Sequence, residues 1–200
     1  MSIVGTKVIR KEDPNLLTGR GQYVDDIQLT GMTHMAFVRS TEAHALIKGI
    51  DVSAALECEG VIGAWTAADL ELPPLPEVPG LERPTLATDK VRFVGEAVAV
   101  IVAESKYAAA DGTELVVVDY EPLEAVTNIE EATAEDAPLL FEELGSNTVA
   151  EVPSADDHQS VFDSAPHTEK IKLINNRCTA APIETSACLA DYGPAGLTIW

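Results

Sequence analysis

The sequence predicts an α/β fold in which helices cover a small mixed sheet. Short apolar stretches and two helix-forming stretches follow one another in the order strand, helix, strand, strand, helix, strand, and such an order favours an α/β arrangement. The composition is that of a folded domain, because 46% hydrophobic and 23% charged residues lie within the usual globular range. The 200 residues are enough for one domain with an appended segment.

The first half of the predicted domain holds three strands and one helix. Apolar, β-prone residues flanked by turn formers predict the strands, and the helix is expected to follow an N-cap at Asp51 or Ser53 and to end near Glu59 and Gly60. Thr66 is expected to cap a brief turn. The strands are predicted at residues 32–40, 46–50 and 61–65.

The second half begins after a loop at residues 72–84, which holds five of the twelve prolines and cannot form a helix or a central strand. The apolar run that follows is interrupted at Gly95 and Glu96, which we interpret as a hairpin turn, although a buried functional acid at Glu96 is the alternative. In the second part of this run, apolar and polar residues alternate little, which predicts a strand buried on both faces. An alanine-rich helix capped by Ser105 and a strand at 116–120 complete the domain.

The rest of the chain divides into a connecting segment and the beginning of another domain. Residues 130–167 are acidic and irregular, with one short helix predicted in QSVFDSAP. The stretches IKLINNRCTAAP, SACLADYG and LTIW predict strands, with a turn at Gly193 and Pro194. We therefore expect an N-terminal segment at 1–20, an α/β domain at 21–129, an acidic linker at 130–168 and the start of a second domain at 169–200.

The charge excludes two classes of partner. Thirteen Lys and Arg face thirty-three Asp and Glu, which gives a net charge of −20 and disfavours binding to nucleic acids and anionic membranes. The N-terminus lacks the apolar core of a signal peptide, and the apolar runs are too short to span a bilayer. The three cysteines are odd in number and have no C-x-x-C spacing. We expect a cytoplasmic protein with free thiols.

The residues suggest no catalytic or metal-binding cluster. His34 and His44 lie in or beside strand patterns, His158 and His167 lie in the linker, and no two share the i, i+4 spacing of a helical metal pair. Gly19 and Gly21 superficially suggest a phosphate loop, but they follow no strand and open no helix. From the residues alone, the prediction stops at an acidic α/β domain and the beginning of another.

Several motifs in order carry a resemblance that goes further. LLTGRGQYVDD, FVRSTEAHALIKGID, VRFVGEAVAVIVAES and ELVVVDYEPLEAVTN resemble the α/β-hammerhead region of the molybdenum-binding large subunits of the xanthine dehydrogenase, aldehyde oxidase and aerobic carbon monoxide dehydrogenase family. The later NNRCTAAPIETSACLADYGPAGLTIW is similar to the entry into the molybdenum-cofactor domain of these proteins.

The resemblance implies an oxidoreductase whose holoenzyme uses a molybdenum–pterin cofactor to insert a water-derived oxygen into a substrate such as carbon monoxide, an aldehyde or an N-heterocycle. It also implies iron–sulfur clusters and FAD in partner subunits or domains, and a dimer of holoenzyme protomers. The family's cofactor loops and catalytic glutamate have no counterpart here. We therefore predict that this chain alone binds no cofactor and is inactive.

Two polar residues match positions that recur in the family at the start of the cofactor domain. They are Arg177 and Glu184 in NNRCTAAPIET. The Ile183-Glu184-Thr185 stretch with the following Cys188 is similar to a motif of the carbon monoxide dehydrogenase branch that some xanthine oxidase relatives share, so it does not define the substrate. Glu184 has two interpretations. It is either a carboxylate that contacts the groups binding the cofactor, without binding the cofactor itself, or a hydrogen-bonded structural acid between strands.

Two hypotheses of different classes follow. The first is the N-terminal part of a molybdenum hydroxylase large subunit, with an architectural role in packing against the cofactor domain and partner subunits. The alternative is a stand-alone hammerhead module without catalysis. We expect a stand-alone module to finish after a completed element, whereas LTIW leaves an apolar strand with an open edge.

Overall fold

The computed structural model describes residues 4–5, 7–73, 81, 84–152, 158–176, 178–182 and 184–200. Contacts within the chain divide it into two units, one of residues 32–160 and one that joins residues 1–31 to residues 161–200. Most of the predicted proline-rich loop at 72–84 falls outside the described residues.

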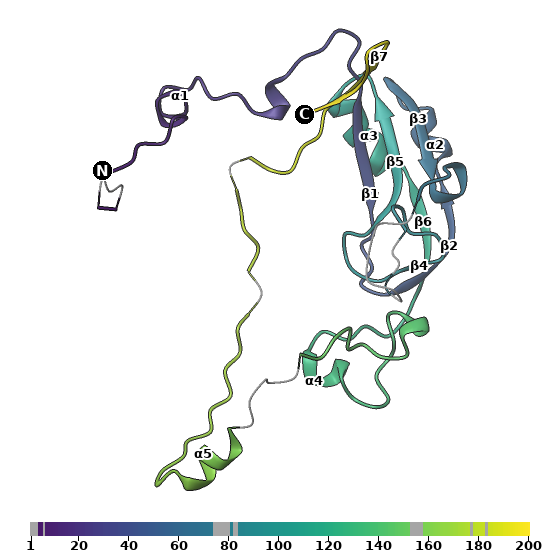
Figure 1. Cartoon of the computed structure of the whole chain (residues 1–200). Helices are drawn as coiled ribbons and strands as arrows, with labels where there is room; N and C mark the ends of the chain where they lie inside the picture. The colour runs from purple at the N-terminus through teal and green to yellow at the C-terminus, as the bar shows by residue number, and fades with distance from the viewer. Residues whose placement is uncertain are drawn as a thin grey trace. The chain divides into compact units, whose positions relative to one another are not determined.

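The larger unit contains a first three-stranded sheet with β5 at its centre. All its pairs are antiparallel, and the strand order is β1-β5-β3, in which β1 is His34–Arg39, β3 is Val61–Thr66 and β5 is Ala97–Ala103. Figure 1 shows these strands side by side. Five of the seven residues of β5 are buried and they lie on both of its faces, which confirms the prediction of a strand buried on both faces.

A second three-stranded sheet has the order β4-β2-β6 and is also antiparallel. The strands are β2, Ala45–Asp51; β4, Lys90–Val91; and β6, Val117–Pro122. The pairing of β2 with β6 is interrupted between Ile47 and Gly49. Because such a bulge inserts one residue, Ile47 and Ile50 lie on the same face of β2 although they are three residues apart, and both pack against the core.

Two helices cover the first sheet on the side of Ile101. The longer helix, α3 (Lys106–Glu114), begins after Ser105, whose side chain accepts a hydrogen bond from the Ala108 amide, as predicted for this cap. Figure 1 shows α3 behind β1 and β5. A Cβ at Gly112 would lie 2.9 Å from Ile101 Cγ2, so glycine lets the helix approach the sheet closely.

The shorter helix, α2 (Ser53–Leu56), packs against α3 and β3. Its N-cap is Val52 rather than the predicted Asp51 or Ser53, and it ends before the predicted Glu59. The Asp51 carboxylate instead accepts a hydrogen bond from the Ser53 amide, which forms a local turn ahead of the helix. The predicted cap at Thr66 is confirmed: Thr66 precedes η2 (Ala67–Asp69), and its amide and hydroxyl both donate to the carboxylate of Asp69, the last residue of η2.

The core lies between the two sheets and the helices. It consists of small and β-branched apolar residues from both sheets, with Ile47, Ile50, Val118 and Tyr120 packed against its edge. The largest fully buried side chains are those of Val91, Val98 and Ile101.

Two expectations about the strands need correction. The strands form two antiparallel sheets rather than one small mixed sheet. Gly95 and Glu96 do form a turn, with Gly95 at a φ of +92°, but not a hairpin, because β4 pairs with β2 whereas β5 pairs with β1 and β3. The physical reason is that partners distant in the sequence bury more of the β5 run than a neighbouring two-residue strand can.

Part of the acidic segment packs against the larger unit. It contains α4 (Ile129–Ala132) and η3 (Glu142–Leu144). The Lys90 ammonium, which is buried, pairs with the Glu142 carboxylate at 2.5 Å. The Arg92 guanidinium donates through Nε to the Leu140 carbonyl at 3.0 Å and lies 4.9 Å from the centre of the Phe141 ring. Charged side chains thus hold residues 140–142 against β4 and the residue after it.

Asn147 closes the same segment on itself. Its side-chain amide donates to the carbonyls of Ala132 and Pro138, and its side-chain oxygen accepts from the Leu140 amide. All hydrogen-bonding groups of one short side chain are therefore engaged, and residues 132–147 form an ordered loop rather than a plain spacer.

The smaller unit contains short elements and one hairpin. These are α1 (Asp13–Leu17), η1 (Val24–Asp26), α5 (Gln159–Ser164), β7 (Ala190–Gly193) and β8 (Gly196–Ile199). The helix predicted in QSVFDSAP and the turn at Gly193 and Pro194 are confirmed. The strand predicted in IKLINNRCTAAP is wrong for the described residues of that stretch, which carry no strand. An extended segment becomes a strand only when another strand completes its hydrogen bonds.

Candidate functional site

Of the two polar residues expected near a cofactor, one is described. The Glu184 carboxylate accepts a hydrogen bond from the Val24 amide at 3.3 Å, 160 residues earlier in the chain. Val24 begins η1, where the Asp26 carboxylate accepts from the Tyr23 amide. Glu184 thus joins the N-terminal and C-terminal parts of the smaller unit. Arg177 lies outside the described residues, so the structure does not bring the two together.

Metal binding by the described residues would require several side chains placed together to hold an ion. Among the described residues, no three His, Cys, Asp or Glu side chains lie where they could hold a metal ion. Cys178 and Cys188 are exposed and free.

The buried polar groups of the larger unit are mostly engaged in structural contacts. Glu96 is buried, and its carboxylate accepts the Arg92 amide at 2.5 Å, so it stabilises the turn before β5 and is no free acid. His44 is buried beside the Glu124 carbonyl, 2.7 Å from Nδ1. A carbonyl can only accept, so Nδ1 carries the proton. Within the described part of the chain, His44 Nε2 is the buried side-chain atom without a partner.

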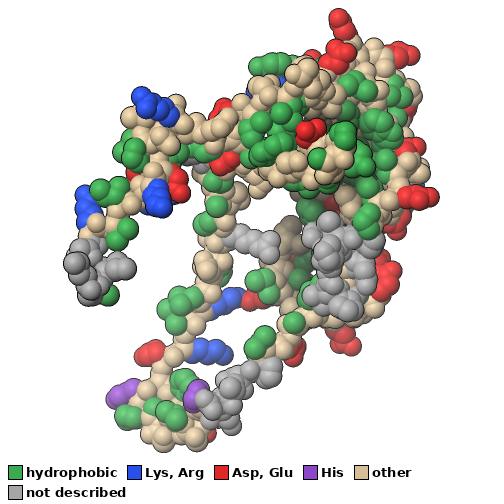
Figure 2. Space-filling view, turned by 45° about the horizontal axis from the view of Figure 1, so that its top comes forward, with side chains coloured by type: hydrophobic (Ala, Val, Ile, Leu, Met, Phe, Trp, Pro, Cys, Tyr) green, Lys and Arg blue, Asp and Glu red, His purple; other side chains and the backbone are tan. Residues whose placement is uncertain are grey.

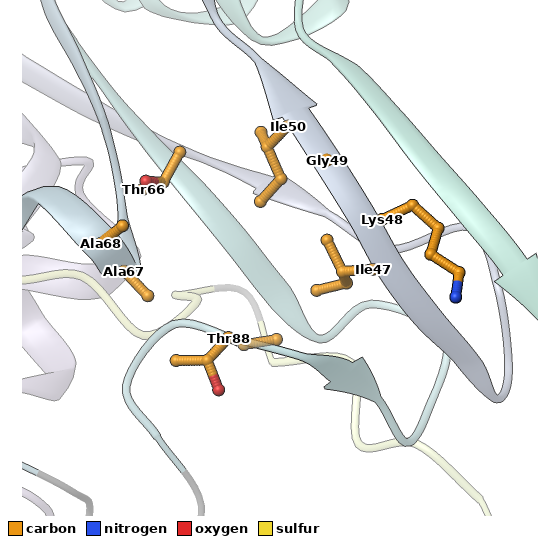
Figure 3. A pocket seen from close by; sticks show the side chains of 9 residues that line it. Ile47, Lys48, Gly49, Ile50, Thr66, Ala67, Ala68 and Thr88 are labelled. Carbon is orange, nitrogen blue, oxygen red and sulfur yellow. The ribbon is translucent and has the colours of Figure 1, made fainter.

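An open pocket of about 360 Å³ lies beside the bulge of β2. Figure 3 shows Ile47 and Ile50 pointing from β2 toward Thr66, Ala67 and Thr88, whereas Lys48 points away, toward its ion-pair partner Glu121. The hydroxyls of Thr66 and Thr88 donate to neighbouring aspartates. With no ionised side chain turned inward among the labelled residues, the pocket offers apolar contact rather than acid–base chemistry.

The outer face of the first sheet is a second feature that could bind a partner. It is the face opposite Ile101, and antiparallel register places Phe37, Val100 and Trp65 in one row across it. The next row is Met35, Val102 and Gly63. Met35 is 61% exposed and Phe37 is 38% exposed. Hydrophobic side chains gather on the strand-rich part of the molecule in Figure 2, with acidic side chains mostly at its margins.

Sequence reasoning did not single out this face. The signal was present in β1, where Met35 to Val38 are apolar on both faces of the strand, as in a strand that is covered on both sides.

Comparison with known proteins identifies the class. The model of the aldehyde oxidase and xanthine dehydrogenase α/β-hammerhead domain matches residues 18–124. The chain belongs to this family, as the resemblance predicted. No helix among the described residues is long and apolar enough to cross a membrane.

Individual relatives are the large subunits of a hydroxylase and a dehydrogenase. The chain is 41% identical to the nicotine 6-hydroxylase large subunit of Paenarthrobacter nicotinovorans over 96% of its own length and 24% of that subunit. It is 37% identical to the carbon monoxide dehydrogenase large chain of Afipia carboxidovorans over 98% of its length and 27% of that chain.

A solved structure, quinoline 2-oxidoreductase from Pseudomonas putida 86, superposes with a TM-score of 0.71 and 42% identity over 82% of this chain and 22% of that one. The chain thus spans about a quarter of the length of such relatives.

Proposed function

We propose that this chain is the N-terminal part of the large subunit of a molybdenum hydroxylase, an oxidoreductase that inserts a water-derived oxygen into its substrate. The observation that supports this most strongly is the alignment of nearly the whole chain with large subunits of nicotine 6-hydroxylase and carbon monoxide dehydrogenase. The substrate classes we propose are those of the family, namely carbon monoxide, aldehydes and N-heterocycles. When bound, the molybdenum–pterin cofactor would supply the oxygen-transfer chemistry.

The role of this segment is architectural. Its described residues form a packed core and offer apolar surfaces, but they do not form a metal-binding cluster. It would therefore support the cofactor domain and partner subunits that carry iron–sulfur clusters and flavin, in a dimer of protomers and in the cytoplasm. Free cysteines agree with a reducing compartment.

The test uses a subunit that contains this segment, produced in a host that makes the cofactor. We expect molybdenum in the purified complex at about one atom per large subunit, and ¹⁸O from labelled water in the product of an N-heterocyclic, aldehyde or carbon monoxide substrate. For the 200-residue chain alone we expect neither molybdenum nor dye reduction. Stoichiometric molybdenum in the isolated chain would show that the segment is not merely architectural.

We propose the predicted domain boundaries as the units of this architecture. The contacts of Lys90, Arg92 and Asn147 protect part of the acidic linker at 130–168, so limited proteolysis should cut first between residues 148 and 167. Early cutting within β5 would contradict a stable hammerhead domain at 21–129.

Glu184 and Arg177 are proposed to lie near the cofactor in the assembled subunit. Both residues occupy the stretch that resembles the entry into the cofactor domain, which supports this proposal. The hydrogen bond from the Val24 amide to the Glu184 carboxylate supports the alternative, a purely structural role for Glu184. Replacing Glu184 by Gln in the loaded subunit separates the two. A carboxylate near the cofactor predicts a changed Mo(V) electron paramagnetic resonance spectrum, whereas a structural acid predicts an unchanged spectrum.

A further inference from the structure

We propose that the outer face of the first sheet is the surface on which the remainder of the large subunit docks. This proposal rests on the proposed function and names the contact that makes the segment part of a larger subunit. The face is formed by Met35, Phe37, Trp65, Val100 and Val102, with Arg39 at its edge.

The side chains of this face form a flat apolar surface. Val100 is buried at its centre, between the flanking Phe37 and Trp65 of the same row. The Trp65 ring lies over Gly63, in the space that a Cβ at that position would need. The large ring therefore lies flat on the sheet, and the face can meet another flat apolar surface. Contiguous exposed apolar side chains of this kind mark interaction surfaces.

The other elements of this unit cover the opposite face. Gly112 of α3 approaches Ile101 and Val61, and Val38, Ala64, Ala99 and Ile101 belong to the core shared with the second sheet. Alternation along a strand places those residues and the outer-face residues on opposite sides. The exposure of Met35 and Phe37 thus marks the part of this face that the described elements leave open, whereas Val98, further along the same side of β5, is buried in the core.

The distribution of charge favours a segment of the same polypeptide as the partner that docks on this face. The three strands contain no Asp or Glu, although the whole chain has thirty-three. Two copies of a chain with a net charge of −20 repel each other, which disfavours a second copy on this face, and an anionic membrane is disfavoured for the same reason. An apolar surface of the same polypeptide suits strands that carry no Asp or Glu.

Arg39 indicates the chemistry at the edge of the docked surface. Its guanidinium lies 5.6 Å from the centre of the Phe37 ring, and Nη1 donates to the Gly95 carbonyl at 2.8 Å. The remaining N–H groups of an arginine fork suit a carboxylate or carbonyl acceptor. The lengths of the relatives indicate which partner docks here. The region matched by this chain is about a quarter of their large subunits, and the other three quarters of each subunit belong to the same polypeptide.

The experiment is a hybrid subunit in which this chain replaces the matching first quarter of the Paenarthrobacter nicotinovorans nicotine 6-hydroxylase large subunit, expressed in that host. The test variant is Met35→Gln with Phe37→Gln. The control is Val117→Gln, because Val117 is 65% exposed on β6 of the other sheet. The readouts are the yield of assembled large subunit on size exclusion and the hydrogen-exchange protection of β1 and β3.

We expect the double variant to lower the assembled yield at least about tenfold, as for residues at the centre of an interface, and the control to leave it unchanged. In the unmodified hybrid, β1 and β3 should be better protected than in the isolated chain. If the unmodified hybrid assembles and the double variant assembles equally well, the docking proposal is wrong. If the unmodified hybrid does not assemble, the proposed function itself is contradicted.

Two measurements on the isolated chain complete the test. Circular dichroism should show that the double variant is folded like the unmodified chain. If the double variant does not fold, the single variant Met35→Gln is used in the hybrid in its place. Sedimentation should give the same state of association for the double variant and the unmodified chain. A dimer of the isolated chain that the double variant dissociates would identify a second copy as the occupant and would overturn the proposal.

Discussion

Ile101 of β5 and Ile199 of β8 are the same residue in the same kind of element, in two different environments. Ile101 is fully buried between strands on both sides and beneath α3, whereas Ile199 is 61% exposed on a two-stranded hairpin. A two-stranded hairpin is at best marginally stable in water, while three strands with a packed face can be stable. A strand pattern in the sequence therefore predicts the element but not how much that element stabilises the fold.

The largest effect is expected from truncating these two residues in parallel. Ile101→Ala should lower the free energy of unfolding by about 2–5 kcal/mol, because it removes buried methyl groups and leaves a cavity. Ile199→Ala should change it by less than about 0.5 kcal/mol, as for exposed positions. Urea denaturation followed by circular dichroism measures both. Equal losses would show that the hairpin is as well packed as the core.

Glycine at the helix–sheet contact provides a second paired test. A Cβ at Gly112 would lie 2.9 Å from Ile101 Cγ2 and 3.0 Å from Val61 Cγ2. Gly112→Ala should therefore destabilise by about 1–3 kcal/mol through overpacking, reduced by up to about 1 kcal/mol because alanine favours the helix. At Gly193 of β7 a Cβ meets nothing within 4 Å, so Gly193→Ala should have little effect on the melting temperature. A stabilising Gly112→Ala would show that α3 has room to move.

The contact of the acidic segment with β4 predicts a dependence on pH. A hydrogen bond from the Lys90 ammonium holds the pKa of Glu142 below its ordinary value of 4.5. The Glu142 carboxylate therefore stabilises the folded chain when the pH is above the pKa that Glu142 has in the unfolded chain. This contribution is lost as the pH falls through the lower pKa that Glu142 has in the folded chain.

Glu142→Gln tests this contact, because it leaves Lys90 buried without its charged partner. Near pH 7 the loss should be about 1–2 kcal/mol. It should shrink as the pH falls below 4.5 through the lower pKa that Glu142 has in the folded chain, because the carboxylate is then protonated. The control is the neighbouring, exposed Glu143→Gln. Thermal melts across this pH range give the result, and a loss independent of pH would exclude the ion pair as its cause.

The smallest effect is expected from removing the hairpin altogether. Deleting residues 171–200 should leave the two three-stranded sheets folded, because the core residues all lie between Val38 and Tyr120. It should also reduce self-association, since Tyr192, Leu197 and Ile199 are exposed. Circular dichroism and sedimentation check the two parts. Global unfolding on deletion would mean that the hairpin is integral to the core and that the proposed boundary is misplaced.

Local signals predicted much of the fold. The Ser105 cap of α3, the Thr66 turn and the buried run of β5 were readable because each depends on residues close in sequence. The N-cap of α2 was mispredicted because Asp51 forms a turn ahead of the helix rather than capping it. The hairpin expected at Gly95 was wrong because the pairing of β4 and β5 depends on strands far away in the chain.

The candidate site was less accessible to sequence reasoning. Glu184 was singled out only through resemblance, and its contact with Val24 spans 160 residues, so no local pattern could have indicated it. Phe37 and Trp65 are both apolar residues in predicted strands, but only strand register places them in one row on an uncovered face.

The sequence by itself determined the class of fold, the family, the acidity and most of the helices and strands, because these depend on composition, local spacing and ordered motifs. The tertiary structure alone decided which strands pair, which face of the first sheet is covered, and that Lys90 and Arg92 hold the acidic segment. The physical reason is that pairing and burial are settled by competition among all the partners in the chain, and their free energy is realised only when distant segments meet.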